Sequence, residues 1–185
     1  MATLRKAAAY SKKQVVPYTR ISKKKGKSYV KTVPQQKIVK FNMGKENLFN
    51  EGKLPHVLTL ISDEKVQIRH NALEACRQFI NKKLDTGLKG QYFFKIVPYS
   101  HHIQREHRML TGAGADRMSS GMQLSFGKAM GKAAIVKKGT RILFAGVANP
   151  KAVSLLRHLM KQIKSKLPGK TSIVYELMNN DVLNK

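Results

Sequence analysis

The distribution of charge restricts this chain's folding more than any other feature of its sequence. Residues 1–45 contain thirteen Lys or Arg and no Asp or Glu, and the first carboxylate is Glu46. A segment so basic, with only scattered apolar residues, cannot compact by burying its own surface. We therefore expect residues 1–35 to form a basic, extended N-terminal arm, which is either ordered by a partner or left solvated.

The whole chain repeats this imbalance, with a formal net charge of +26 on 185 residues. Self-repulsion on this scale opposes folding unless a polyanion or counterions neutralise it. Nucleic acid and an anionic membrane surface are the two candidates. A segment that spans a bilayer needs a run of about 18 apolar residues, and this sequence contains no such run. Both amphipathic helices predicted below need their apolar stripes for a core, so we expect no membrane partner.

From residue 36 the pattern becomes that of a globular domain, expected at 36–177 with a polar tail at 178–185. The hydrophobic fraction of 42% is sufficient for a core. A turn is expected at 42–44 and a hairpin loop at 137–140. Strands are expected at 37–41, 56–62, 92–98, 133–136, 141–147 and 171–175.

Two amphipathic helices are predicted between these strands. The first should begin near Asp63 and Glu64, carry Lys82 and Lys83 in its last turn, and stop at Gly87. Its apolar stripe includes the single cysteine, Cys76, which we interpret as a core residue.

The second helix should have Asn149 as its N-cap and Pro150 as its first residue, and it should end before Pro168-Gly169. The expected fold is therefore α+β, a two-layer sandwich of two helices on one mixed or antiparallel sheet.

A long segment at 99–132 is the candidate functional loop, since structureless stretches of this length inside a domain are usually functional or disordered. It is basic and rich in glycine, which allows its backbone to approach another backbone closely. Arg105, Arg108 and Arg117 supply planar donors suited to phosphate.

The sequence argues against an enzyme, a metal site and a bound cofactor. The histidines at 101, 102 and 107 do not have the spacing of a zinc motif. The glycines at 112–117 lack the Gly-Lys-Ser/Thr ending of a nucleotide loop. Ser119, Ser120 and Ser125 have no identifiable base and carboxylate.

Neither helix has the setting of a helix-turn-helix reader of double-stranded DNA. Cations spread over an arm, a loop and helix faces suit folded RNA, which is read by shape and phosphate position. We therefore predict RNA as the partner and exclude DNA. A free-standing RNA chaperone or translation regulator and an RNA-modifying enzyme remain as alternatives.

Four stretches carry a resemblance to a known family: VQIRHNALEA at 66–75, FKIVPY at 94–99, GAGADRMSSGM at 112–122 and FGK at 126–128. They resemble the large-subunit ribosomal protein sixteen family, in its archaeal and eukaryotic branch, ten-e. The resemblance runs from about residue 17 to about residue 174. The chain departs from the family pattern at Gln123, Ala129 and Lys132, where Arg, Pro and Thr are common.

The resemblance implies a structural component of the large ribosomal subunit in the cytoplasm, bound to ribosomal RNA and neighbouring ribosomal proteins near the peptidyl transferase centre. It also makes tRNA a candidate partner, through a loop tip at 100–112 that carries His101, His102, Arg105 and Arg108. Charge and resemblance together give the expected RNA-binding residues: Lys12, Lys13, Arg20, Lys23, Lys24, Lys25, Lys27, Arg69, His70, Arg77, Arg117, Lys128 and Lys132.

Overall fold

The computed structural model describes residues 8–19, 30, 32–106 and 127–178. Its largest element is a five-stranded antiparallel sheet, sheet A, with the strand order β1-β4-β7-β2-β8. The strands are β1 (Asn42–Gly44), β2 (His56–Ser62), β4 (Tyr92–Ile96), β7 (Arg141–Val147) and β8 (Thr171–Leu177). The class predicted from sequence, α+β with antiparallel pairing, is confirmed.

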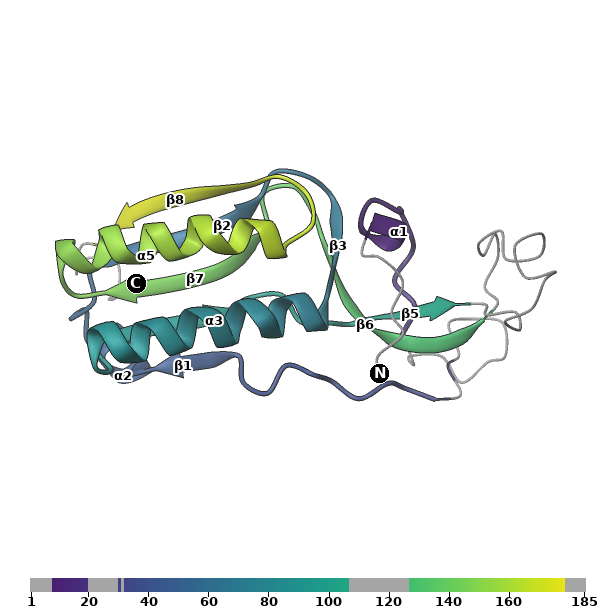
Figure 1. The fold of residues 1–185 in the computed structure, drawn as a ribbon, viewed down its shortest axis with the longest axis horizontal. Helices are drawn as coiled ribbons and strands as arrows, with labels where there is room; N and C mark the ends of the chain where they lie inside the picture. The colour runs from purple at the N-terminus through teal and green to yellow at the C-terminus, as the bar shows by residue number, and fades with distance from the viewer. Residues whose placement is uncertain (1–7, 20–29, 31, 107–126, 179–185) are drawn as a thin grey trace.

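Two long helices, α3 (His70–Leu88) and α5 (Pro150–Ile163), lie side by side over one face of sheet A (Figure 1). Their buried stripes meet the apolar side chains of the strands in one continuous core. Its fully buried members include Leu58, Leu60, Leu73, Cys76, Ile80, Leu84, Phe94, Leu143, Leu156 and Met160. Burial raises the pKa of the Cys76 thiol to about 12, so this cysteine is an inert core residue as predicted.

The opposite face of sheet A is partly covered by a short helix, α2 (Glu46–Asn50). Phe49 of this helix stacks on Phe93 at a centroid distance of 5.2 Å and meets the edge of Phe144 at 5.3 Å. Helix α2 was not predicted, because five residues are too few for a helical period to show.

A second sheet, sheet B, was not predicted. It has three antiparallel strands in the order β3-β6-β5, namely β3 (Val66–Arg69), β6 (Lys128–Val136) and β5 (His102–Glu106). It extends from the end of the two-helix body, and the short helix α1 (Ala8–Ser11) lies beside it (Figure 1). Part of the segment at 99–132, predicted to be structureless, therefore belongs to strands, and residues 107–126 lie outside the described ranges.

Sheet B also explains an error in the predicted connections. The 137–140 turn does not close a hairpin, because β6 pairs in sheet B and β7 pairs in sheet A. The turn instead joins the two sheets beside the β2–β3 connection. Ser62 fixes it there, accepting a hydrogen bond from the Gly139 amide at 2.7 Å and donating its own amide to the Thr140 carbonyl at 3.0 Å.

The first helix begins later and ends later than predicted. Asp63 and Glu64 lie in the β2–β3 connection, β3 intervenes, and α3 starts only at His70. At the other end Gly87 lies inside the last turn, and Lys89 takes the left-handed conformation that ends the helix. By contrast α5 begins at Pro150 after Asn149 as predicted, although the Asn149 side chain makes no capping hydrogen bond.

The prediction of a strand at 37–41 is wrong. The strand in this region is β1, at residues 42–44, where a turn was expected. Val39 donates its backbone amide to the Glu74 carboxylate at 3.4 Å instead of to a neighbouring strand. β1 pairs with β4 at residues 42–44. Gly44 has φ +81° and sits against the Tyr92 backbone, which lets the edge strand end there.

Candidate nucleic-acid interface

The N-terminal segment at 8–19 lies along sheet B and is held by contacts to its main chain. Gln67 donates its side-chain amide to the Lys13 carbonyl at 2.9 Å. Ile103 donates its backbone amide to the Tyr18 carbonyl at 2.8 Å, and Tyr18 donates its own to Nδ1 of His102 at 2.9 Å. This part of the basic segment therefore has a fixed path on the chain's own sheet.

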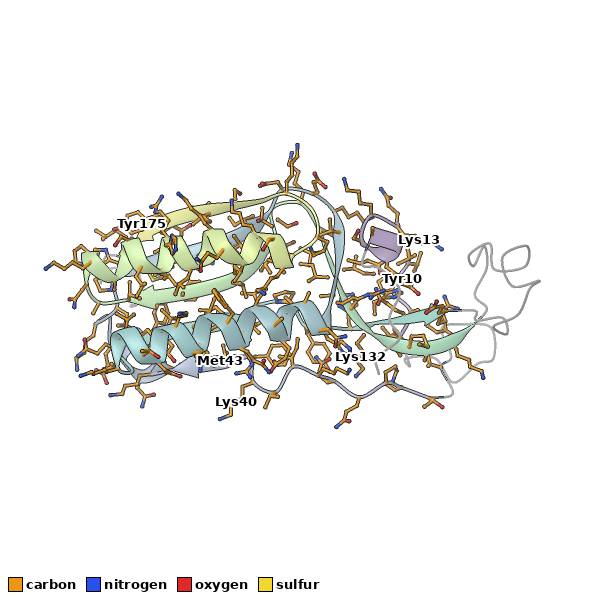
Figure 2. The ribbon with its side chains drawn as sticks, in the orientation of Figure 1. Tyr10, Lys13, Lys40, Met43, Lys132 and Tyr175 are labelled. Carbon is orange, nitrogen blue, oxygen red and sulfur yellow. The ribbon has the colours of Figure 1, made fainter. Side chains whose placement is uncertain are left out.

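Two arginines of sheet B stack on tyrosines of that segment. The guanidinium carbon of Arg69 lies 4.6 Å from the centroid of the Tyr10 ring, and that of Arg105 lies 3.6 Å from the Tyr18 ring. Stacking fixes a guanidinium plane while leaving its edge available for hydrogen bonds. Figure 2 shows Tyr10 and Lys13 together at the sheet B end of the molecule, far from Tyr175.

Two histidines of the predicted site are buried at this end. His102, 5% exposed, lies in β5, and His70, 4% exposed, is the first residue of α3. Burial lowers the pKa of each to about 4, helped at His70 by the positive charges of Lys37, Lys132 and Arg69 and at His102 by His101 and Arg105. Both rings are therefore neutral at pH 7.

Buried polar atoms without a hydrogen-bond partner gather around the same end. Within the described part of the chain, most of the residues concerned flank sheet B or the start of α3, whereas Thr59 lies in sheet A. Those near sheet B include Gln36, His70, Asn71, Ser100 and Arg105, the last through one of its guanidinium nitrogens. Native proteins satisfy most buried polar groups, so such a concentration calls for an explanation.

Most of the other predicted site residues within the described ranges are exposed or half-buried. Lys12, Lys13 and Lys128 are exposed, although Lys12 also forms a 3.5 Å ion pair with Glu64. Lys132 is half-buried on β6 near the first turn of α3, as Figure 2 shows. His101 directs Nδ1 to the Tyr99 carbonyl at 3.0 Å.

Arg77 has its charge paired within its own helix. Its guanidinium donates two hydrogen bonds to the Glu74 carboxylate, at 2.7 and 2.8 Å, one turn earlier on α3. Seven of the predicted residues lie outside the described ranges, together with the serines considered above and the motif at 112–122. The seven are Arg20, Lys23, Lys24, Lys25, Lys27, Arg108 and Arg117.

Sequence reasoning missed the residues that hold this end together. Tyr10, Tyr18, Gln67 and Gln104 had no role assigned in the predicted site. Tyr18 of the predicted arm, for example, pairs with the chain's own β5. No periodicity in the sequence indicates which strand it would meet.

Two other kinds of site are absent from the described residues. Residues 8–19, 30, 32–106 and 127–178 contain no group of three or more His, Cys, Asp or Glu placed to hold a metal ion. Among the same residues, none of the helices has the length and apolar character needed to cross a bilayer.

Comparison with known proteins gives a consistent family. Residues 16–174 match the model of the family described as ribosomal protein L16p/L10e. Three similar proteins, each named large ribosomal subunit protein uL16, come from archaea. That of Methanospirillum hungatei is 43% identical over 82% of this chain and 86% of its own length. Those of Methanococcus maripaludis and Staphylothermus marinus are 43% and 40% identical, over 92% and 94% of this chain and 93% and 94% of their own.

The two-sheet α+β body and the cationic end built on sheet B are thus those of a ribosomal protein. The chain belongs to the ribosomal protein L16p/L10e family, as the resemblance in its sequence implied.

Proposed function

We propose that the sheet B end is the surface through which this chain binds large-subunit ribosomal RNA. Family membership makes the chain a structural, non-enzymatic constituent of the large ribosomal subunit, working with ribosomal RNA and other ribosomal proteins in the cytoplasm. The proposal concerns which part of the molecule meets the RNA.

The observation that carries the proposal is the coincidence of cations and unsatisfied polar atoms. Lys13, Lys128 and Lys132 surround the end where buried side-chain atoms of Asn71 and Ser100 lack partners among the described residues. Phosphates would cancel the positive charge. The polar atoms, which solvent does not reach in the free protein, would meet ribose hydroxyls or bound water once their side chains turn toward the RNA. The exposed faces of α5 and of α3 beyond its first turn, both within the described ranges, offer lysines without such atoms.

Binding should consist of electrostatic docking followed by a fit of shapes. Each lysine or arginine that meets a phosphate releases condensed counterions, which favours binding and makes it sensitive to salt. If the N-terminal arm at 1–35, the loop segment and sheet B together neutralise roughly ten phosphates, log K should fall with log[salt] at a slope near −7 to −9.

A matched pair of triple variants tests this assignment. Lys13, Lys128 and Lys132 changed to Ala should make the slope shallower by roughly 3, because about one counterion is released per phosphate contact. Lys82, Lys83 and Lys161 changed to Ala remove the same charge from the exposed face of α3 and α5. The measurement is filter binding of the full chain to large-subunit RNA at several salt concentrations. An equal loss in both variants would refute the assignment.

We further propose that the segment after β4 reaches toward the peptidyl transferase centre and tRNA, in keeping with the family resemblance. Arg105, held by Tyr18 at the base of this segment, would position it. Arg20, the lysines at 23–27, Arg108 and Arg117 would extend the RNA contacts. Changing Arg105 and Arg108 to Ala should leave the α3–α5 core folded and impair translation, and unchanged translation would count against this role.

The alternative of a free-standing RNA chaperone has its own test. A subunit constituent stays with the large subunit, at one copy per particle, through a high-salt wash. Release of the chain in such a wash, with RNA binding retained, would favour the chaperone.

A further inference from the structure

Strand β8 forms one edge of sheet A, and with seven residues it is the longest edge strand of the two sheets (Figure 1). The other edges are short or covered. β1 has three residues, α1 contacts β3, and β5 bonds through its Ile103 amide to the Tyr18 carbonyl. In the part of the chain that the structure describes, no strand pairs with the outer side of β8.

The direction of the backbone groups in β8 follows from two hydrogen bonds at its ends. Asp63 donates its amide to the Lys170 carbonyl at 3.0 Å, and Met178 donates its amide to the Pro55 carbonyl at 2.8 Å. In an antiparallel pair, residues that bond to the facing strand alternate with residues that do not. The register is unbroken between these two bonds, so the even-numbered residues of β8 bond to β2 and the odd-numbered ones direct their N–H and C=O groups outward.

The outer side of β8 lacks the usual features that keep edge strands from pairing. Native edges are blunted by lysine, proline or a bulge, and β8 has none of these. The outward carbonyl of Thr171 accepts a hydrogen bond from Nζ of Lys164 at 2.7 Å. The outward groups of Ile173, Tyr175 and Leu177 are not bonded by any described residue.

The chemistry of this edge suits an extended protein segment. Donors and acceptors alternate along it with the repeat of a strand, whereas RNA phosphates only accept hydrogen bonds. Tyr175 and Leu177 add apolar surface, being 41% and 57% exposed. Glu176 is exposed, forms no ion pair within the described ranges and would repel phosphate. A second copy of the chain is disfavoured by the repulsion between two net charges of +26.

We propose that a neighbouring protein of the large subunit adds one extended strand to β8. This segment bonds to the outward backbone groups of residues 173–177, and it carries apolar side chains beside Tyr175 and Leu177. It places a lysine or arginine across from Glu176, because opposite charges on facing strands stabilise the pair. The inference rests on membership of the ribosomal family and is independent of the assignment of RNA to the sheet B end.

Hydrogen exchange tests the pairing, measured residue by residue on the full chain in three states. These are the free chain, the chain bound to protein-free large-subunit RNA, and the chain within the large subunit. The amides of Ile173, Tyr175 and Leu177 should exchange rapidly in the first two states and at least about tenfold more slowly in the third. The amides of Val174 and Glu176 are the internal control, because they bond to β2 in every state.

Several results of this experiment would overturn the proposal. Equal exchange of the outward amides in all three states would show that the edge stays open. Slowing by RNA alone would make RNA the occupant. Slowing in the free chain would make the occupant a second copy if it grows with protein concentration, and another part of the same chain if it does not.

Two substitutions at one position separate backbone pairing from side-chain packing. Tyr175→Pro removes an outward N–H, which an edge strand tolerates, and Tyr175→Val removes the same ring but keeps the N–H. Each variant competes with equal amounts of tagged wild-type chain during reconstitution of the large subunit. The proline variant should be taken up roughly three- to tenfold less than the valine variant, the effect of one lost hydrogen bond. Equal uptake would overturn the pairing.

A charge reversal gives a test of opposite sign, which remains informative if the proline variant does not fold. Glu176→Lys should reduce uptake roughly two- to fivefold, because like charges would then face each other across the strands. Glu51→Lys makes the same change of charge outside β8 and should alter uptake by less than about twofold. Increased uptake of Glu176→Lys would indicate a phosphate neighbour and overturn the proposal.

The outcomes are distinguishable from those of the proposed function. The β8 variants should bind protein-free large-subunit RNA within about twofold of the wild type, since no phosphate contact is lost. Full uptake of these variants, together with the expected loss of RNA binding in the Lys13, Lys128 and Lys132 variant, would overturn the β8 contact and leave the sheet B interface standing. The reverse pattern would overturn the sheet B interface alone.

Discussion

The two ends of this molecule are built on different principles. The α3–α5 end buries leucines, isoleucines and phenylalanines between two helices and a five-stranded sheet. The sheet B end has fewer apolar residues in its interior and relies on stacked arginines, buried histidines and main-chain bonds to residues 8–19. The α3–α5 end is a closed apolar core, whereas the sheet B end has cations and buried polar groups that a polar, anionic partner could contact.

The largest loss of stability should come from a substitution in the core of the α3–α5 end. Phe94 is fully buried in β4, and Phe94→Ala should reduce the free energy of unfolding by about 3–5 kcal/mol, since a cavity is left. Val39→Ala, at a side chain 72% exposed, should cost less than about 0.5 kcal/mol. Urea unfolding followed by circular dichroism measures both. A small loss at Phe94 would mean that the core is not the source of stability.

The sheet B end should be the part that acid weakens first. His70 and His102 have folded-state pKa values of about 4, below the ordinary 6.5, so their contribution is full above pH 6.5 and is lost as the pH falls toward 4. Each contributes at most about 3 kcal/mol. At His102, protonation of Nδ1 also ends the hydrogen bond from Tyr18.

Hydrogen exchange at several pH values tests this difference between the ends. Amides of β5 and β6 should lose protection between pH 6.5 and 4 before those of β2 and β7 do. Simultaneous loss at both ends would show that the two ends unfold as one unit.

Backbone geometry gives an intermediate effect with a matched control. Gly44 and Gly139 share φ +81°, but a Cβ at Gly44 would lie 2.2 Å from the Tyr92 carbonyl oxygen, whereas at Gly139 no described atom would be within 4 Å. Gly139→Ala should cost about 1 kcal/mol from strain alone, and Gly44→Ala about 2 kcal/mol or more. Thermal unfolding compares the pair, and equal losses would contradict close packing at β1.

The smallest effect concerns Arg77, a predicted RNA-binding arginine whose charge is paired with Glu74. Glu74→Gln should destabilise the fold by about 1–2 kcal/mol at pH 7, because the charge-assisted bonds from Arg77 weaken. Those bonds lower the pKa of Glu74, so the wild-type advantage is present above the ordinary value of 4.5 and disappears as the pH falls through the folded value.

Glu51→Gln is the control for that measurement, because the Glu51–Lys53 pair is exposed and should contribute within about 0.5 kcal/mol. Chemical unfolding at pH 7 and at about pH 3 compares the two variants. A Glu74→Gln loss that persists undiminished in acid would show that the carboxylate's charge is not the cause.

The sequence was most informative where a local signal and the global fold agree. Pro150 after Asn149, followed by an apolar stripe of helical period, placed the start of α5 correctly. The strands at 56–62 and 141–147 have the bounds predicted, since their apolar runs are bounded by polar residues and turns. For these elements the nearest neighbours in the chain determine the structure.

The errors arose where distant pairing decides the outcome. Val66–Arg69 was assigned to the first helix, because Ile68 fits the helical period, but pairing with residues 133–136 makes it a strand. The pairing of residues 102–106 with 128–133 joins segments separated by a stretch poor in core residues. The site was predicted as a set of charges, and the sequence contained no signal for the stacking of Tyr10 and Tyr18 on arginines of sheet B.

The pairing of β5 with β6 has one further consequence. Glu106 lies opposite Lys128 in the register, so the chain leaves the sheet and returns to it at adjacent positions. The entropic cost of bringing these two points together is met by the strand pairs, and it grows only slowly with the number of intervening residues. Insertions or deletions between Glu106 and Lys128 should therefore leave sheet B undisturbed. The length of this segment can then change during evolution while the strands that hold its two ends stay the same.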